Sequence, residues 1–295
     1  MSGGAGYLQE EVRRWWRAGE ECAEVMGLPL GRKVWRGVGG DWQGAGVGDS
    51  LEFEDHRAYF PGDDPRQINW QAYARTGEYS MKVYREEVRV MVDVVVDGTA
   101  SQFYREDKAA RVVGLVGFVV AAARRAGMSL RVWRVGGERA DLLDAGMGSG
   151  LADRLVEGGC PGMRPAFERV ELRGYSLRVV VSDLLFPGDE AVVGDWLVRS
   201  GGRGLVLVPQ SRGESDPGWG GNLEFEDVES GVWESRRVGE EEMAAYRRAY
   251  AAHFAGWREG LRRRGAGMAR VPVEEGLLGA LQQEALREGV VEWWG

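Results

Sequence analysis

The residues best suited to chemistry follow a short apolar run, VDVVVDGTAS, at residues 92–101. Asp97, Thr99 and Ser101 place one carboxylate and two hydroxyls at two-residue steps after that run. Because the run is apolar at most positions, it predicts a strand buried on both faces in a parallel sheet. A loop at the end of such a strand can direct three oxygen atoms at one hard cation. The pattern therefore favours binding over bond cleavage.

A second acidic strand end supplies the other half of this predicted site. Asp183 follows Ser182 at the end of LRVVVSD, residues 177–183. The carboxyl ends of parallel strands meet at one edge of a sheet, where ligands bind. Two carboxylates with hydroxyls suit Mg²⁺, Mn²⁺ or Ca²⁺ better than zinc or copper. The alternative is structural, because Asp97 and Thr99 could instead cap the helix expected near Arg105 or hold the turn.

Motifs of known enzyme classes do not fit the same residues. Phosphotransferases of the haloacid dehalogenase type carry a nucleophilic aspartate two residues before a second aspartate, and here Val95 stands at that position. Valine cannot form an aspartyl-phosphate. A metal-dependent hydrolase that uses Asp97 and Asp183 stays open as an alternative, although no general base is evident in the sequence. No catalytic residue is predicted.

The order of elements predicts an α/β fold. Strands and helices alternate from residue 88 onward, which indicates a mostly parallel sheet with helices on both faces. An amphipathic helix is expected at residues 7–26, and short strands and turns at residues 50–87. The later strands are expected at 88–96, 129–135, 177–182, 204–208 and 268–273, and the later helices at 105–126, 151–157, 189–200, 240–264 and 274–288.

Composition excludes several classes of protein. The formal charge of -8 argues against general affinity for nucleic acid or anionic lipid. No apolar run reaches the roughly 20 residues that a membrane span needs. Two distant cysteines, Cys22 and Cys160, indicate reduced thiols and a cytoplasmic protein, and two histidines are too few for a histidine-based zinc site.

Residues 52–87, EFEDHRAYFPGDDPRQINWQAYARTGEYSMKVYREE, resemble the signature of the domain-of-unknown-function 58 proteins. In that family a phrase of this kind precedes a von Willebrand factor A-like domain. The resemblance continues through DGTAS, SDLLFP and FEDVESG (residues 225–231), so that it extends from about Gly31 to the C-terminus. The matching positions are Glu52, Phe53, Arg57, Tyr59, Pro61, Gly62, Asp63, Asp64, Arg66, Ile68, Trp70, Ala74, Arg75 and Thr76.

The resemblance implies a Rossmann-like von Willebrand A domain with a metal-ion-dependent adhesion site. The family's D-x-S-x-S loop matches Asp97, Thr99 and Ser101, and its later aspartate matches Asp183. In such sites the hydroxyls bind Mg²⁺ or Mn²⁺, and an acidic residue of a partner fills the open position. A threonine is usual in a third loop, where the best alignment has Cys160, Pro161 and Gly162, and proline offers no side-chain oxygen, so the site is expected to be weakened or vestigial.

The resemblance also implies a role and a partner. We expect a non-enzymatic protein-interaction module that works with a MoxR-type AAA+ ATPase in the assembly or maturation of other proteins. The signature side chains either face a partner or fix the subdomain that carries them, and the sequence leaves both interpretations open. These side chains are Arg57, Asp63, Asp64, Arg66, Trp70 and Arg75.

Three parts are expected along the chain. Residues 1–30 form an N-terminal helix, residues 31–87 form a small β-rich subdomain with the PGDD segment, and residues 88–295 form the von Willebrand A-like domain with C-terminal helices.

Overall fold

The computed structural model describes residues 7–29, 51–60, 68–86, 90–157, 164–186 and 188–294, with side chains described outside 51–57 and 81–86. The chain divides into two compact units, Gly31–Arg89 on one hand and Met1–Leu30 with Val90–Gly295 on the other. The expected N-terminal helix region thus belongs to the same unit as the α/β domain.

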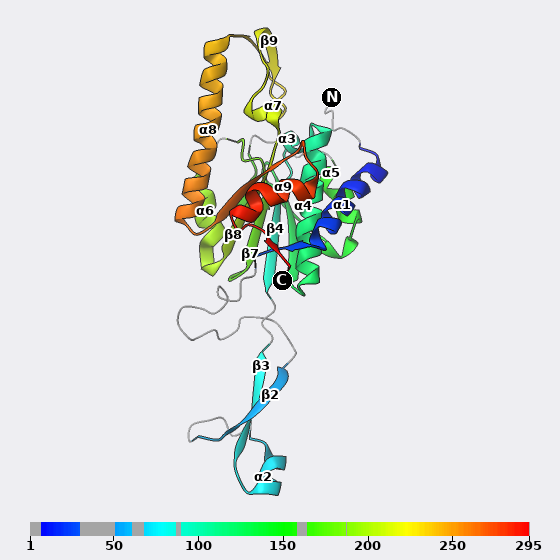
Figure 1. Ribbon diagram of the computed structural model, residues 1–295, viewed down its shortest axis with the longest axis vertical. Coiled ribbons are helices and arrows are strands. Elements are labelled where there is room, and N and C mark those ends of the chain that lie inside the picture. Colours follow the sequence, from blue (N-terminus) through cyan, green and yellow to red (C-terminus); the bar gives the residue numbers. More distant parts are fainter. Residues whose placement is uncertain are drawn as a thin grey trace. The chain divides into compact units, whose positions relative to one another are not determined.

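A six-stranded sheet forms the centre of the larger unit. The strands lie in the order β11-β8-β7-β4-β5-β6, and all neighbours are parallel except β5 and β6 (Figure 1). If the six strands are numbered 1 to 6 in chain order, from β4 to β11, their order across the sheet is 3-2-1-4-5-6. This is the doubly wound arrangement, in which the strand order reverses between β4 and β7. The predicted Rossmann-like, von Willebrand A-type fold is confirmed. The bounds are β4 (Met91–Asp97), β5 (Ser129–Gly136), β6 (Arg139–Leu143), β7 (Leu177–Val181), β8 (Arg203–Gln210) and β11 (Gly267–Pro272).

Helices cover both faces of this sheet, as predicted. Helices α1, α4, α5 and α9 lie on one side, and α6 and α8 lie on the other (Figure 1). Successive side chains of a strand point to opposite faces, so Val95 and Val180 pack with Trp196 and Trp257 in the core under α6 and α8. The bounds are α1 (Gln9–Ala23), α4 (Glu106–Arg125), α5 (Gly150–Val156), α6 (Glu190–Val198), α8 (Glu240–Arg263) and α9 (Leu277–Ala280).

Glycines allow α1 to approach α4 closely. A Cβ on Gly19 would lie 2.1 Å from the carbonyl oxygen of Gly114, and a Cβ on Gly117 would lie 2.7 Å from that of Trp16. Helix α4 is therefore enclosed by the sheet on one side and by α1 on the other. This enclosure explains why its sequence is apolar nearly all round.

Several elements were not predicted. Strand β6 follows β5 through a two-residue turn and is short and largely exposed, so it lacks an apolar run. A separate antiparallel hairpin consists of β9 (Gly221–Glu226) and β10 (Trp233–Val238). The helix expected at residues 274–288 runs without a break from 277 to 287, but Leu281–Ala285 within it are π-helical. The larger unit also contains β1 (Met26–Gly27), which pairs with β12 (Glu292–Trp293), and the four-residue helices α3 (Ala100–Phe103) and α7 (Arg212–Ser215). Short 3-10 helices lie at Ala145–Met147, Phe167–Arg169 and Arg199–Gly201.

In its described residues, the smaller unit has two strands and one helix. Strand β2 (Leu51–Ala58) pairs in antiparallel fashion with β3 (Ser80–Glu86), and α2 (Trp70–Thr76) lies between them in the sequence. The side chain of Asn69 caps α2 by accepting a hydrogen bond from the backbone N–H of Ala72 at 3.2 Å. This helix was not expected in a segment predicted to be strands and turns. Its end is set by Gly77, which has a φ of 75°.

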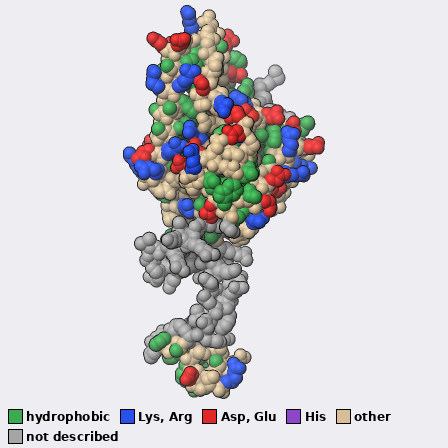
Figure 2. Space-filling model, viewed as in Figure 1, with side chains coloured by type: hydrophobic (Ala, Val, Ile, Leu, Met, Phe, Trp, Pro, Cys, Tyr) green, Lys and Arg blue, Asp and Glu red, His purple; other side chains and the backbone are tan. Residues whose placement is uncertain are grey.

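The face of the larger unit shown in Figure 2 mixes both signs of charge. Lys and Arg side chains lie beside Asp and Glu side chains over the face shown in Figure 2. Such a surface differs from the one-sign surface that nucleic-acid binding requires. Within the described ranges, no helix has both the length and the apolar character to cross a bilayer.

Candidate functional site

The DGTAS loop folds around the carboxylate of Asp97 at the end of β4. Asp97 is buried, and its Oδ1 accepts hydrogen bonds from the backbone N–H of Thr99 at 3.0 Å and from the Thr99 hydroxyl at 2.6 Å. The Thr99 Oγ1 lies 3.3 Å from the Ser101 Oγ. Thr99 starts α3 without a side-chain capping bond. Asp97 therefore holds the turn, which is the structural role considered above as an alternative to metal binding. The hydroxyls of Thr99 and Ser101 also lie side by side.

A close approach requires the glycine of this loop. The N–H of Gly98 donates to the carbonyl oxygen of Val135 on β5 at 2.6 Å. A Cβ at residue 98 would lie 2.9 Å from Cγ and Nε of Arg134. A larger residue here would push the loop away from the neighbouring strand.

Strand β7 brings Ser182 and Asp183 to the same place. The Ser182 hydroxyl donates to Oδ2 of Asp97 at 2.7 Å, and Nε2 of Gln102 donates to the same oxygen at 3.3 Å. Asp183 is 3% exposed, and its Oδ1 accepts a hydrogen bond from the N–H of Leu185 at 3.0 Å. The structure thus brings together the four residues expected from the sequence at the reversal point between β4 and β7.

Burial changes the ionisation of Asp97. Removal from water, reinforced by the negative charge of Asp183, raises the pKa of Asp97 to about 7 against the opposing hydrogen bonds from Thr99 and Ser182. The carboxyl is therefore partly protonated near neutral pH. A positive charge beside it would favour the ionised form.

A buried lysine, which could not be recognised in the sequence, holds Asp183. Nζ of Lys108, in the first turns of α4, lies 2.5 Å from Oδ2 of Asp183 and 2.5 Å from Oε1 of Glu214. Burial opposes the charge on Lys108, but the two carboxylates outweigh it and raise its pKa above the usual range. Lys108 therefore stays charged and compensates Asp183 from inside the protein. In the sequence it is one charged residue among several in REDKAA.

Glu229 is the second residue missed by the sequence analysis. It lies in the loop between β9 and β10, and its Oε1 accepts a hydrogen bond from the N–H of Ser101 at 2.8 Å. Its Oε2 accepts from the N–H of Ala100 at 3.3 Å. The segment FEDVESG was already part of the family resemblance, but its sequence distance from DGTAS hid the contact.

A cavity of about 240 Å³ lies between the DGTAS loop, the end of β7 and the loop that carries Glu229. Its oxygen donors are carboxylates and hydroxyls, which is the donor chemistry that Mg²⁺ or Mn²⁺ takes. In the part of the chain that the structure describes, no three His, Cys, Asp or Glu residues form a metal-binding group, so a cation here would need the hydroxyls. The residues expected in the third loop, Cys160, Pro161 and Gly162, lie outside the described ranges. The cavity is lined by Asp97, Thr99, Ser101, Asp183, Leu185, Phe186, Asp227, Val228 and Glu229.

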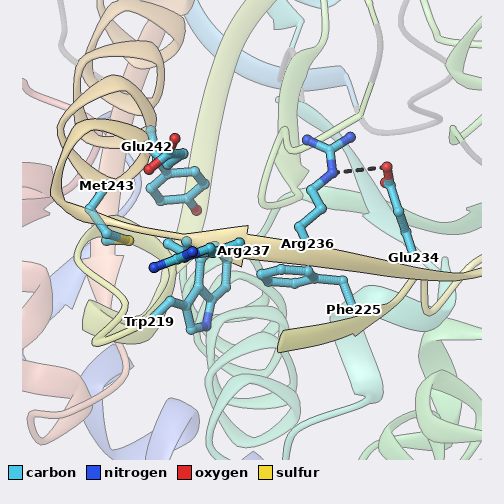
Figure 3. Close-up of a pocket in the computed structure, with 9 residues that line it drawn as sticks. Trp219, Phe225, Glu234, Arg236, Arg237, Glu242 and Met243 are labelled. Atoms are coloured by element: carbon cyan, nitrogen blue, oxygen red, sulfur yellow. Dashed lines mark ion pairs between the residues drawn. The ribbon is translucent and has the colours of Figure 1, made fainter. Parts of the chain in front are cut away.

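A second cavity, of about 300 Å³, lies between the β9–β10 hairpin and α8 (Figure 3). Trp219 contacts Phe225 with ring centroids 4.9 Å apart and Tyr246 with centroids 5.2 Å apart. The ion pair between Nε of Arg236 and Oε1 of Glu234, at 2.9 Å, lies on its edge (Figure 3). These aromatic contacts seat the hairpin on α8, and this cavity was not predicted.

The signature residues are only partly described. Trp70, at the start of α2, is 57% exposed, and Arg75 lies in the last turn of the same helix. Tyr73 and Tyr79 stack with centroids 4.4 Å apart, and Trp70 meets both rings edge-on. Asp63, Asp64, Arg66 and the side chain of Arg57 lie outside what the structure describes.

Comparison with known proteins gives one family and several remote structural likenesses, including two from Bacteroides species. An aerotolerance-related membrane protein from Bacteroides fragilis NCTC 9343, with multiple mutations to serines, shares 14% identity at a TM-score of 0.35, over 68% of this chain and 98% of its own. The conserved hypothetical protein BatB from Bacteroides thetaiotaomicron shares 10% identity at a TM-score of 0.33, with the same coverage of 68% and 98%. No curated protein matches the chain. The model of the family described as protein of unknown function DUF58 matches residues 55–259, more than half of the chain, and the protein belongs to that family, as its signature predicted.

Proposed function

We propose that this protein is a non-enzymatic protein-interaction module whose binding site is the cavity at the carboxyl ends of β4 and β7. The site takes a divalent cation, Mg²⁺ or Mn²⁺, and an acidic side chain of a partner. The observation that carries this proposal is the pair of hydroxyls of Thr99 and Ser101, 3.3 Å apart, in one cavity with the buried carboxylates of Asp97 and Asp183.

Each residue has a part in this proposal. Thr99 and Ser101 offer neutral oxygen ligands. Asp97 supplies negative charge, together with Asp183, whose counter-ion Lys108 is shared with Glu214. A bound cation supplies the positive charge that accepts a partner's carboxylate. Ser182 fixes Asp97 through a hydrogen bond of 2.7 Å, so that the site is held in place before a ligand arrives.

The hydrogen bonds of the carboxylates favour binding over hydrolysis. Both oxygens of Asp97 accept hydrogen bonds from protein donors, and Asp183 is paired with Lys108. Glu229 is bound to two backbone N–H groups. A general base needs a free position toward the proton that it abstracts. These carboxylates are already bound to donors of the protein, which supports an interaction module without catalysis.

The proposed partner is a MoxR-type AAA+ ATPase, and the cellular role is the assembly or maturation of other proteins. The family resemblance supports this part of the proposal. The test uses the purified ATPase encoded nearest to this gene and measures its binding to the immobilised full-length protein, in Mg²⁺ and in EDTA. We expect binding in Mg²⁺ that weakens at least tenfold in EDTA and in the Ser101→Ala variant.

A matched control distinguishes loss of a site hydroxyl from the same substitution elsewhere on the surface. Ser235→Ala makes the same change on the exposed strand β10 and should bind the ATPase as wild type does. Equal binding by wild type and Ser101→Ala in Mg²⁺ would contradict the proposed site. Absence of binding by wild type would contradict the proposed partner.

A further inference from the structure

We propose that Glu229 is an internal acidic ligand of the cavity, and that the tip of the β9–β10 hairpin occupies the place of a partner's carboxylate. A partner would then be an acidic segment that displaces this tip. The inference rests on the proposed function, because it assigns the ligand chemistry and the regulation of the same site.

The first argument is the contact itself. Glu229 lies 128 positions from Ser101 in sequence, yet its carboxylate reaches the loop that carries both hydroxyls, at 2.8 Å from the N–H of Ser101 and 3.3 Å from that of Ala100. Asp227 and Val228 of the same tip also line the cavity. A carboxylate from a distant element therefore lies in a cavity that already holds two buried aspartates, where a like charge is unfavourable unless donors compensate it.

The second argument is that the tip is built to present Glu229. Oδ1 of Asp227 accepts hydrogen bonds from the N–H of Glu229 at 2.8 Å and of Ser230 at 3.3 Å. The N–H of Gly231 donates to the carbonyl oxygen of Asp227 at 2.7 Å, and Gly231 has a φ of 69°, which glycine adopts without strain. The turn is thus closed within the tip, and it would keep its shape if the tip left the cavity.

The third argument is that few described contacts hold the hairpin to the rest of the larger unit. Strands β9 and β10 pair only with each other among the described strands, and most of their side chains are exposed. An isolated two-stranded hairpin is marginally stable by itself. It is seated on α8 mainly through Trp219 and Phe225, and the cavity of about 300 Å³ in Figure 3 lies beside these rings. Because these rings lie at the strands of the hairpin and not at its tip, displacement of the tip would leave them in contact.

Occupation of the site by Glu229 lowers the apparent affinity for a partner. A ligand that binds only the open form has its apparent affinity reduced by the fraction of molecules that are open. If about one molecule in ten is open, removal of the Glu229 carboxylate raises the apparent affinity about tenfold. The alternative is that Glu229 is a static part of the loop, and the experiment must separate these two roles.

The first measurement is hydrogen–deuterium exchange on the full-length protein in EDTA, where no cation is needed. The Glu229→Ala variant should exchange the amides of Ala100 and Ser101 at least tenfold faster than wild type. Glu226→Ala, which removes an exposed carboxylate from the same hairpin, should leave them unchanged. Unchanged protection in Glu229→Ala would overturn the contact on which the inference rests.

The second measurement uses a synthetic peptide of residues 221–238 as the probe, in Mg²⁺. It should bind the Glu229→Ala protein at least tenfold more tightly than wild type or Glu226→Ala, and the same peptide with alanine in place of Glu229 should not bind. Equal affinities for all three proteins would overturn the internal-ligand role even if the exchange result holds. If Mg²⁺ binds neither wild type nor Glu229→Ala while the exchange result holds, the proposed function is overturned instead.

Discussion

Replacement of Lys108 by methionine is expected to lower the free energy of unfolding by about 3–5 kcal/mol, the range found when one partner of a buried ion pair is removed. Lys108 is 3% exposed and lies 2.5 Å from carboxylate oxygens of both Asp183 and Glu214. Methionine fills a similar volume but leaves Asp183, itself nearly fully buried, without its counter-ion. Urea denaturation of the full-length protein at pH 8 in EDTA measures the loss.

Two further variants show whether charge is the cause. Arg105→Met removes an ion pair with Asp107 that is largely exposed, and should change stability by less than about 1 kcal/mol. Lys108→Met combined with Asp183→Asn removes the more buried of the two unpaired charges, the other being that of Glu214, and should recover a large part of the loss. A loss below about 1 kcal/mol in Lys108→Met would contradict a buried, charged pair.

The Asp97→Asn variant is expected to gain stability relative to wild type as the pH rises from about 4 to about 7. Burial and the charge of Asp183 raise the pKa of Asp97 from 3.8 to about 7 in the folded protein. Between these values the unfolded carboxyl has lost its proton while the folded one keeps it. The wild type therefore loses stability as the pH rises through this window, by at most about 4 kcal/mol, and its contribution is gone above pH 7.

Asparagine can be accommodated at residue 97. Its Oδ1 still accepts the N–H of Thr99, and rotation of the Gln102 amide presents Oε1, a buried atom without a hydrogen-bond partner among the described residues, to the new N–H₂ group. Urea denaturation at pH 5, 6, 7 and 8 in EDTA measures the difference between the two proteins. Asp141→Asn, exposed on β6, is the matched control and should show no such trend. A constant difference from pH 5 to pH 8 would contradict the raised pKa.

The sheet could be predicted because its strands carry their own signal. The run from Val92 to Asp97 and the run from Leu177 to Val181 are mostly apolar, and both are central strands covered on two faces. Edge strand β6 and the exposed hairpin were missed for the opposite reason. Their residues face water, so no apolar period marks them.

The same distinction applies to the candidate site. Asp97, Thr99, Ser101 and Asp183 follow strands that the pattern identifies, so topology alone brings them to one edge of the sheet. Lys108 and Glu229 could not be predicted in this way. Each reaches the site through a tertiary contact between elements far apart in the chain, and a lysine in a helix or a glutamate in a turn is usually solvated.

The central claim, that the hydroxyls beside Asp97 take a divalent cation, is tested most directly by isothermal titration of the full-length protein with Mg²⁺ and Mn²⁺. Wild type and Ser235→Ala should bind one equivalent, and Ser101→Ala should bind at least tenfold more weakly because it lacks one of the two hydroxyl ligands. The absence of binding to wild type, or equal binding by wild type and Ser101→Ala, would contradict the account.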